Sequence, residues 1–153
     1  MKQIIKYSFI LILIDQIIKI LVSNMIESII IIKKFFNLTY VENTGAAFSI
    51  LENNTIFLII ITFISLFLIY IFLLKNKKFN KLEIVTYSLL IGGIIGNLID
   101  RIMYGYVIDY LEFIILNRHM PIFNFADICI VIGTFLFLFI TIKEEQNARI
   151  CNK

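Results

Sequence analysis

Few side chains in this 153-residue chain can take part in chemistry, and most of these lie within or beside long apolar stretches. An ionisable group inside a membrane costs free energy unless it is paired or hydrated, so each such residue is a candidate for function. The candidates are Asp15, Lys19, Asn43, Asn97, Asp100, Arg101, Asp109, Asn124 and Asp127. They are carboxylates, amides and basic groups, and their chemistry must come from proton transfer and hydrogen bonding.

The sequence lacks the residues that serine, cysteine and zinc hydrolases use. Its one histidine is His119, and no G-x-S-x-G motif is present to supply an activated serine. Neither an H-E-x-x-H motif nor a pair of closely spaced cysteines is present to bind zinc. We therefore expect no nucleophilic serine or cysteine, no metal and no other cofactor.

Paired carboxylates remain as the chemistry that these residues support. Two aspartates held close together share one proton, because ionising both is costly. The ionised one can take a proton from an attacking water while the protonated one donates to the developing oxyanion of a peptide bond. Any two of Asp100, Asp109 and Asp127 could form such a pair, and their spacing in the sequence does not choose among them.

The composition indicates that a lipid bilayer is the solvent for most of the chain. Hydrophobic residues make up 60% of the sequence and charged residues 16%, with a mean hydropathy of +0.94. A compact domain of this size with this composition would not stay soluble. The net charge of +3 is small, and the lysines lie mostly at the ends of apolar runs, which argues against nucleic acid as a partner.

Four apolar stretches have roughly the 20 residues that a helix needs to cross about 30 Å of hydrocarbon. They cover residues 4–22, 55–74, 82–102 and 123–142. The sequence therefore predicts an all-α membrane protein with four transmembrane helices, formed as a single domain over residues 1–153.

The orientation of these helices follows from the basic residues at their ends, because lysine and arginine favour the cytoplasmic side. Lys2 and Lys6 lie at the start of the first stretch, four lysines lie within residues 75–81, and Lys143 follows the last stretch. The opposing residues are Lys33, Lys34, Arg101 and Arg118. We expect both termini to be cytoplasmic and residues 23–54 and 103–121 to lie outside.

The two outer segments have different patterns. Residues 35–41 are rich in aromatic and β-branched residues and are followed by Asn43-Thr44-Gly45, which predicts a small sheet or hairpin. Residues 110–116 within segment 103–121 are amphipathic, which predicts a short helix lying on the membrane surface.

This topology brings the candidate residues to one depth. The ends of stretches 4–22 and 82–102 and the start of stretch 123–142 all lie near the outer surface. Asn43 and Asp109 belong to the outer segments at the same level. The sequence therefore predicts one polar layer near the outer interface.

Structural roles are the alternative for several of these residues. Asp15 and Lys19 have the spacing of an intrahelical ion pair, which could serve only to anchor the first helix. Asp127 could simply cap the last helix. Gly92 and Gly96 form a small-xxx-small pair, which favours close helix packing.

Five ordered motifs, taken together, resemble those of the bacterial lipoprotein signal peptidases, the signal peptidase II family. They are Asp15-Gln16-Ile17-Ile18-Lys19, Asn43-Thr44-Gly45-Ala46-Ala47-Phe48-Ser49, Gly92-Gly93-Ile94-Ile95-Gly96-Asn97-Leu98-Ile99-Asp100-Arg101, Val107-Ile108-Asp109-Tyr110 and Phe123-Asn124-Phe125-Ala126-Asp127. The resemblance covers nearly the whole chain. Ile94 and Phe125 depart from the usual pattern, which has a small residue at the first position and an aliphatic one at the second.

The resemblance implies that Asp109 and Asp127 are the catalytic pair of an aspartic endopeptidase. It also implies that the other motif residues support the site or bind substrate. These are Asp15, Lys19, Asn43, Gly45, Asn97, Asp100, Arg101 and Asn124.

The resemblance further implies the substrate and the location. The substrate would be a prolipoprotein whose lipobox cysteine carries diacylglycerol, cleaved just before that cysteine. The enzyme would be a monomer in the bacterial cytoplasmic membrane, in contact with membrane lipids, with its active site near the outer face.

A small ion-coupled transporter is the rival interpretation from another functional class. It would relay protons through ionisable residues at mid-depth in the membrane. Stretch 55–74 has no ionisable residue except Tyr70, and stretch 123–142 carries its one charged residue, Asp127, near its start. Stretch 82–102 carries Glu83 near its start and Asp100 with Arg101 at its end, with no charged residue between them. The distribution therefore favours the peptidase.

Overall fold

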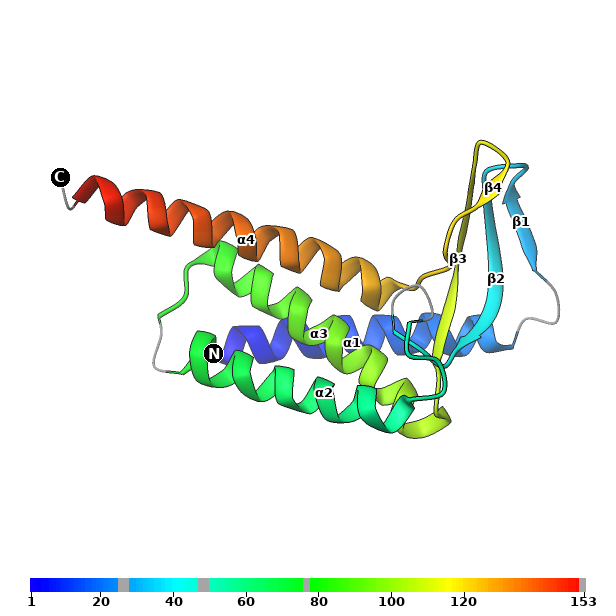
Figure 1. Cartoon of the computed structure of the whole chain (residues 1–153), viewed down its shortest axis with the longest axis horizontal. Coiled ribbons are helices and arrows are strands. Elements are labelled where there is room, and N and C mark those ends of the chain that lie inside the picture. The colour runs from blue at the N-terminus through cyan, green and yellow to red at the C-terminus, as the bar shows by residue number, and fades with distance from the viewer. Residues whose placement is uncertain (25–27, 47–49, 76–77, 152–153) are drawn as a thin grey trace.

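The computed structural model describes residues 1–24, 28–46, 50–75 and 78–151. Within these residues, long helices run alongside one another and a small sheet lies across one end of them (Figure 1). The helices are α1 (Lys2–Ser23), α2 (Thr55–Leu68) with its π-helical continuation η2 (Ile69–Leu74), α3 (Lys81–Tyr104) and α4 (Phe125–Cys151). The strands are β1 (Ile29–Ile32), β2 (Phe36–Asn43), β3 (Val107–Ile115) and β4 (Arg118–His119).

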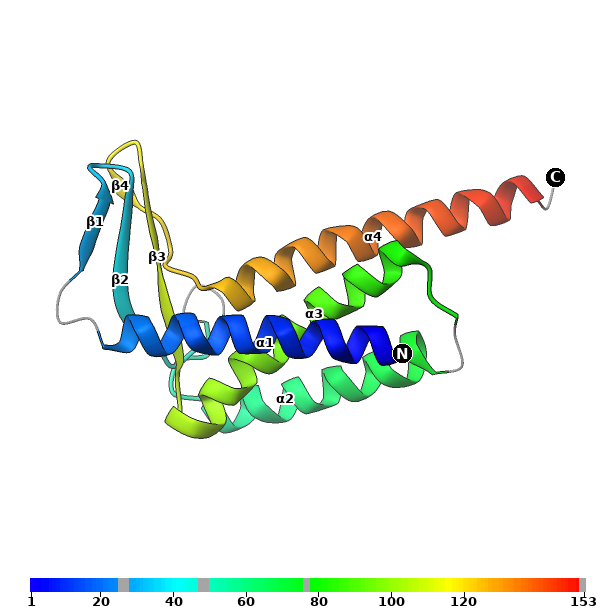
Figure 2. The ribbon, with the colours of Figure 1, turned by 180° about the vertical axis from the view of Figure 1, so that it is seen from behind.

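The sheet and the chain ends lie at opposite ends of the helices. The N-terminus, the C-terminal end of α4 and the start of α3 lie far from the sheet in both views (Figure 1 and Figure 2). Helix α3 packs against both α1 and α4, and α2 packs against α3. The ends of α1 and α3 and the start of α4 therefore meet at the sheet, as the sequence predicted.

The ends of α3 and the start of α4 are fixed by local hydrogen bonds. At the start of α3, Asn80 and Glu83 form a capping box, with N–H···O distances of 2.9 and 2.8 Å. Helix α3 ends at Gly105, whose φ of 85° is in the left-handed region that glycine adopts without strain. Asn124 and Asp127 make the same reciprocal pair of bonds at the start of α4. This last cap places Asp127 in the first turn of α4.

The four strands form one antiparallel sheet in the order β1-β2-β3-β4. In the register of β2 and β3, Val41 lies opposite Asp109 and Asn43 lies opposite Val107. Asn43 and Asp109 are thus diagonal neighbours, whose side chains share one face of the sheet. The predicted sheet around residues 35–41 is confirmed.

The predicted interfacial helix around residues 110–116 is wrong. Most of this segment belongs to strand β3, which pairs with β2 and, at its end, with β4. The segment contains Tyr, Phe and two Ile residues, which favour strands. Pairing with β2 also satisfies backbone groups that an isolated amphipathic turn would leave to solvent.

Three of the helices are long and apolar enough to cross a membrane, counting only the described residues. They cover Thr55–Phe72, Lys81–Tyr104 and Phe125–Ile150. Helix α1 is not among them, because Lys6, Asp15 and Lys19 interrupt its apolar sequence. The predicted count of four spans is therefore not confirmed, although α1 covers the whole of residues 4–22 as a helix. Helix α4 continues past the predicted end at residue 142, because no glycine or proline interrupts it there.

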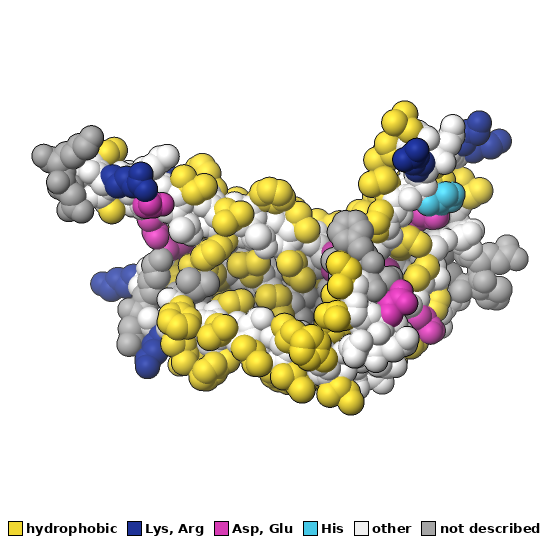
Figure 3. All heavy atoms as spheres, in the orientation of Figure 1, with side chains coloured by type: hydrophobic (Ala, Val, Ile, Leu, Met, Phe, Trp, Pro, Cys, Tyr) yellow, Lys and Arg dark blue, Asp and Glu magenta, His cyan; other side chains and the backbone are white. Residues whose placement is uncertain are grey.

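The surface of the helices is solvated by lipid rather than by water. Hydrophobic side chains cover most of the helical surface on the face shown in Figure 3, and lysine and arginine side chains gather at the two ends. Phe72 and Phe135 are 76% and 69% exposed, with many other large apolar side chains around them. Apolar surface of this extent on a folded chain marks contact with a membrane.

The first prediction concerns the side of the membrane on which the sheet lies. In a chain whose two native cysteines are replaced by serine, a cysteine at His119→Cys should react with an impermeant maleimide added to intact cells. A cysteine at Lys78→Cys, between η2 and α3, should react only after the membrane is broken. Both positions are exposed, so access alone decides labelling. The reverse pattern would place the sheet in the cytoplasm.

Candidate active site

The structure joins all ten predicted site residues into one continuous network of hydrogen bonds and ion pairs. The network draws on α1, β2, α3, β3, the start of α4 and the turn after β2. Its members are Asp15, Lys19, Asn43, Gly45, Asn97, Asp100, Arg101, Asp109, Asn124 and Asp127. The polar layer predicted from the sequence is therefore present at the end of the helices that carries the sheet.

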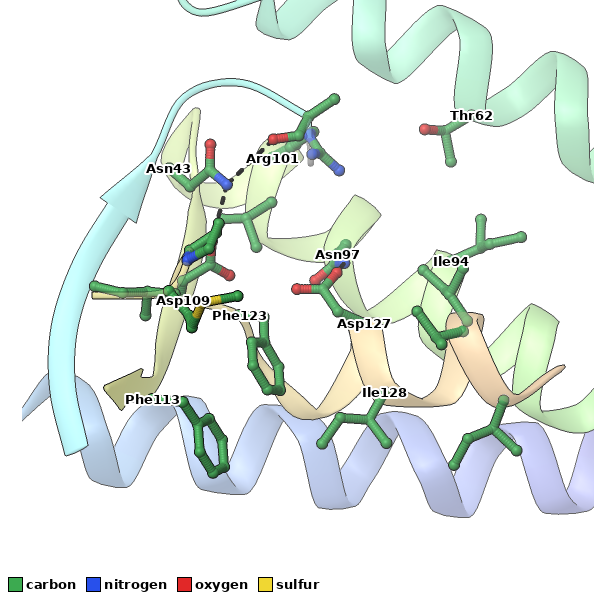
Figure 4. A pocket seen from close by; sticks show the side chains of 18 of the residues that line it. Asn43, Thr62, Ile94, Asn97, Arg101, Asp109, Phe113, Phe123, Asp127 and Ile128 are labelled. Atoms are coloured by element: carbon green, nitrogen blue, oxygen red, sulfur yellow. Dashed lines mark hydrogen bonds between the residues drawn. The ribbon is translucent and has the colours of Figure 1, made fainter. Parts of the chain in front are cut away.

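A cleft of about 710 Å³ opens against one side of this network. Among the four aspartates of the network, Asp109 and Asp127 line the cleft, and their carboxylates point toward one another (Figure 4). The rest of the cleft is mostly apolar, with walls that include Ile94, Phe113, Met120, Phe123, Ile128 and Val131. A polar end with two carboxylates and a long apolar remainder suits a substrate that is itself mostly apolar.

The carboxylate of Asp109 is held by two side-chain amides. Asn43 donates to Oδ2 over 2.8 Å, and Asn124 donates to Oδ1 over 2.7 Å. Burial raises the pKa of Asp109 to about 6, the two amide bonds oppose this rise, and the negative charge of Asp127 adds to it. Asp109 therefore binds a proton more readily than an ordinary aspartate does.

The carboxylate of Asp127 is held by α4 and α3. Its Oδ2 accepts the backbone N–H of Asn124 over 3.1 Å within the capping box, and its Oδ1 accepts from the amide of Asn97 over 2.8 Å. The backbone N–H groups at the start of a helix favour a negative charge in this position. The capping role considered from the sequence is thus present, and it leaves the carboxylate facing the cleft.

Two asparagine amides connect the aspartates, and Lys19 fixes the orientation of one of them. Oδ1 of Asn97 accepts from Lys19 over 2.9 Å and from Asn124 over 3.1 Å. The NH₂ group of Asn97 must then point the other way, toward Asp127. Oδ1 of Asn124 accepts the backbone N–H of Asp127 over 2.9 Å, which directs its own NH₂ group toward Asp109.

Asp15, Lys19 and Asp100 form a buried ion cluster behind the cleft. The ammonium of Lys19 lies 2.9 Å from Asp15 and 2.8 Å from Asp100, and all three side chains are at most 1% exposed. Asp15 also accepts the backbone N–H of Ala126, and Asp100 that of Ile108, each over 3.1 Å. These two aspartates are therefore engaged by a full positive charge and by the backbone.

The glycines of α3 allow the helices to approach this closely. A Cβ atom on Gly96 would lie 2.6 Å from Oδ2 of Asp15, and one on Gly93 would lie 2.4 Å from the carbonyl oxygen of Ala126. Gly92 meets Leu11 of α1 in the same way. Ile94 lines the cleft instead. Its bulk therefore does not disturb the packing that the glycines make possible.

Arg101 ties α3 to the turn after β2. It donates to the carbonyl oxygen of Gly45 over 2.9 Å, and Gly45 in turn donates its N–H to Asn43 over 2.9 Å. Arg101 lines the cleft, and its buried Nε has no hydrogen-bond partner among the described residues. The contact fixes the turn that presents Asn43 to Asp109.

Two residues beside the network were missed in the prediction from sequence. Gln16 donates to both Asp15 and Asp100, and the Tyr110 hydroxyl accepts the backbone N–H of Phe125 over 3.1 Å. Both belong to the motifs quoted above, which was the available signal. Neither is ionised, so the argument from the cost of burying charge did not select them.

Comparison with known proteins identifies the relationship. The family model described as signal peptidase (SPase) II matches residues 7–143. A lipoprotein signal peptidase of Clostridium tetani is 45% identical over 120 residues, which are 78% of this chain and 77% of that protein. One of Halothermothrix orenii is 44% identical over 140 residues, 90% of this chain and 93% of that protein. A solved structure described as a bacterial membrane enzyme superposes with a TM-score of 0.85 at 33% identity, covering 96% of this chain and 92% of that one.

The chain belongs to the signal peptidase II family. It is therefore a membrane peptidase of the aspartic type, and its reaction is the removal of signal peptides from prolipoproteins. The predictions of family, enzyme class and main function are confirmed. The ion-coupled transporter, which was the alternative, has no support from these relatives.

The second prediction concerns the ion cluster of this signal peptidase. Asp15→Asn leaves Lys19 with one carboxylate, and breaking a buried ion pair costs about 3–5 kcal/mol. We expect a clear loss of thermal stability and of folded yield, larger than that caused by Asp127→Asn. Reaction of the buried Cys129 thiol with a fluorogenic maleimide, in a Cys151→Ser background, would report unfolding. An Asp15→Asn variant as stable as wild type would show that the cluster does not hold the fold.

The third prediction concerns Asp109 and pH. The pKa of Asp109 is about 6 in the folded protein, against 3.8 for an aspartate in an unfolded chain, so the folded protein holds this proton more tightly. The contribution of Asp109 to stability is then fully present below pH 4 and is lost as the pH rises through 6. Asp109→Asn should remove this pH dependence of the melting temperature, measured by calorimetry in detergent. A difference in melting temperature that is the same at every pH would reflect the altered hydrogen bonds of residue 109 with the side-chain amides. Parallel curves for the two proteins from pH 4 to 7 would contradict the assignment.

Proposed function

We propose that Asp109 and Asp127 are the catalytic pair of this signal peptidase. The observation that carries the proposal is that these two are the aspartates of the network that line the cleft. Asp15 and Asp100 lie behind it in contact with Lys19. Their oxygens are bound by this ammonium group and by backbone N–H groups, and neither carboxylate lines the cleft. The other pairs that the sequence left open, which include Asp100, are thus disfavoured.

The two aspartates have different surroundings, which supports different roles. Asp109 is 3% exposed and takes up a proton with a pKa near 6, so it would hold the shared proton and act as the acid. Asp127 is more exposed and accepts a backbone N–H at the start of α4, a position that favours negative charge, so it would act as the base.

In the proposed reaction, Asp127 takes a proton from a water molecule as the water oxygen attacks the carbonyl carbon of the scissile bond. Asp109 gives its proton to the carbonyl oxygen as the tetrahedral intermediate forms. The intermediate then collapses as the C–N bond breaks, the leaving nitrogen takes a proton from Asp127, and Asp109 recovers its own proton from the hydroxyl oxygen. Asn43, Asn97 and Asn124 hold both carboxylates in place throughout.

The apolar part of the cleft supports the proposed substrate, a prolipoprotein whose lipobox cysteine already carries diacylglycerol. Cleavage would occur just before that cysteine. The acyl chains would hold the cysteine at the level of the two aspartates, where the helices end and the sheet begins. Ile94, Ile128 and Val131 offer an apolar wall on the side of the cleft away from the sheet. Acyl chains or the apolar core of the signal peptide fit such a wall.

We further propose that α1 crosses the membrane as a fourth span, that both termini are cytoplasmic and that the site lies near the outer face. The buried charges of α1 are paired with one another and with α3, which removes most of their cost inside a bilayer. The lysines near both termini and between η2 and α3 support this orientation. The enzyme would act as a monomer, because one chain supplies both aspartates and all their hydrogen-bond partners named above.

The fourth prediction tests the catalytic pair. Asp109→Asn and Asp127→Asn should each reduce cleavage of a diacylglyceryl prolipoprotein by at least about 10³-fold, because an amide cannot exchange the proton. The double variant should be no worse than either single one, since the two groups work as a unit. Cleavage would be followed as a gel shift, with the unlipidated prolipoprotein as the control that should remain uncut.

Asp100→Asn is the matched control, because it removes a buried carboxylate of the same network that lies outside the cleft. We expect it to retain measurable turnover when activity is normalised to folded protein. A folded but inactive Asp100→Asn protein, together with an active Asp109→Asn protein, would reassign the pair to Asp100 and Asp127.

A further inference from the structure

Asp100 and Asp15 each bind the backbone N–H group of the residue that precedes one of the two proposed catalytic aspartates. Asp100 accepts the N–H of Ile108, which precedes Asp109, over 3.1 Å. Asp15 accepts the N–H of Ala126, which precedes Asp127, over 3.1 Å. The separation of the catalytic carboxylates therefore depends on the separation of Asp15 and Asp100.

Lys19 is one link between these two supporting aspartates, and its hydrogen-bonding capacity is fully used. An ammonium group has three N–H donors. Those of Lys19 go to Asp15, Asp100 and Asn97, over 2.9, 2.8 and 2.9 Å. Its contact with Asp100 is to Oδ2, so Lys19 has no donor left for Oδ1.

Gln16 is the second link. The two N–H groups of its Nε2 are shared among three acceptors, namely Oδ1 of Asp100 at 2.9 Å, the carbonyl oxygen of Gly96 at 3.2 Å and Oδ2 of Asp15 at 3.3 Å. The side-chain amide thus connects α1 to α3 through the oxygen that Lys19 cannot reach. It also brings donors to two carboxylates without adding charge to the cluster.

Gln16 does not line the catalytic cleft. It borders a separate small cavity of about 80 Å³, together with Lys19, Asp100 and Tyr106. None of the described residues around this cavity also lines the cleft. Gln16 is therefore placed to act on the catalytic pair through other residues and not by touching the substrate.

We infer that Gln16 is a positioning residue for catalysis, whose amide bridges Asp15 and Asp100 and thereby fixes the spacing of Asp109 and Asp127. The inference rests on the proposed function of that pair. It assigns Gln16 a role in the rate of the chemical step and none in substrate binding.

The test compares two variants of the full-length enzyme, with a synthetic diacylglyceryl prolipoprotein peptide as substrate and activity normalised to folded protein. Gln16→Met keeps the size of the side chain and removes its donors. We expect kcat to fall about 10-fold with KM changed less than about twofold, because the carboxylates lose their spacing and the cleft is unaltered.

Gln16→Glu adds a readout that a merely structural role would not give. Ionised, it faces two carboxylates with no donor, and protonated, it can donate one O–H to Asp100. Relative to wild type at the same pH, kcat should be reduced about 100-fold at pH 8 and recover to about 10-fold below wild type at pH 5.5. The titratable side chains around the position are Asp15, Lys19, Tyr40, Asp100, Tyr104 and Tyr106.

The matched controls are Gln3→Met and Gln3→Glu, at an exposed glutamine near the start of the same helix, and both should behave as wild type. If Gln16→Met kept wild-type kcat, if Gln16→Glu followed the wild-type pH profile, or if neither variant folded, the inference would be overturned. Asp109→Asn and Asp127→Asn in the same assay separate the two proposals. Activity in either would remove the proposed function, whereas inactivity of both with unaffected Gln16 variants would remove only the role of Gln16.

Discussion

The architecture of the site depends on one buried ammonium group, that of Lys19, held between Asp15 and Asp100. A charge without a partner in this position would carry a desolvation cost of several kcal/mol, so the three residues can be buried only together. Burying them together joins α1 to α3. The two carboxylates also accept the backbone N–H groups of Ile108 and Ala126, which fixes the start of β3 and the start of α4 to the same cluster. One charge cluster thus sets the mutual positions of four elements distant in sequence.

The same cluster divides the aspartates into two chemical classes. Asp15 and Asp100 are bound by a cation, which suits a structural role. Asp109 and Asp127 are bound by neutral amides and backbone N–H groups, which orient a carboxylate without neutralising it. A carboxylate that must gain and lose a proton in each turnover needs this second kind of environment.

The sequence was sufficient for features that follow from local pattern and from membrane physics. Apolar length predicted the helices, and the direction of each helix predicted that the polar residues would meet at one end. Strand β3 was missed because its partner, β2, lies some 70 residues earlier in the sequence. Whether this segment forms a strand or a surface helix depends on that distant pairing. The choice between Asp100 and Asp109 was also out of reach of the residues alone, because it depends on which carboxylate lines the cleft. That property follows from the register of β2 with β3 and from the close approach at Gly96, which no local pattern encodes.

The asparagine side-chain amides connect the buried ammonium group of Lys19 to the two carboxylates in the cleft. The ammonium group itself lies outside the cleft. Because Lys19 occupies the carbonyl oxygen of Asn97, the amide of Asn97 can only donate toward Asp127. Asn124 is oriented in the same sense, and with Asn43 it donates toward Asp109. Each of the four oxygens of Asp109 and Asp127 thereby accepts one N–H from the chain. An ionised carboxylate oxygen can accept more than one hydrogen bond. Each oxygen can therefore still bind a shared proton or a water molecule. The orientation of these oxygens is set by Lys19, which does not line the cleft.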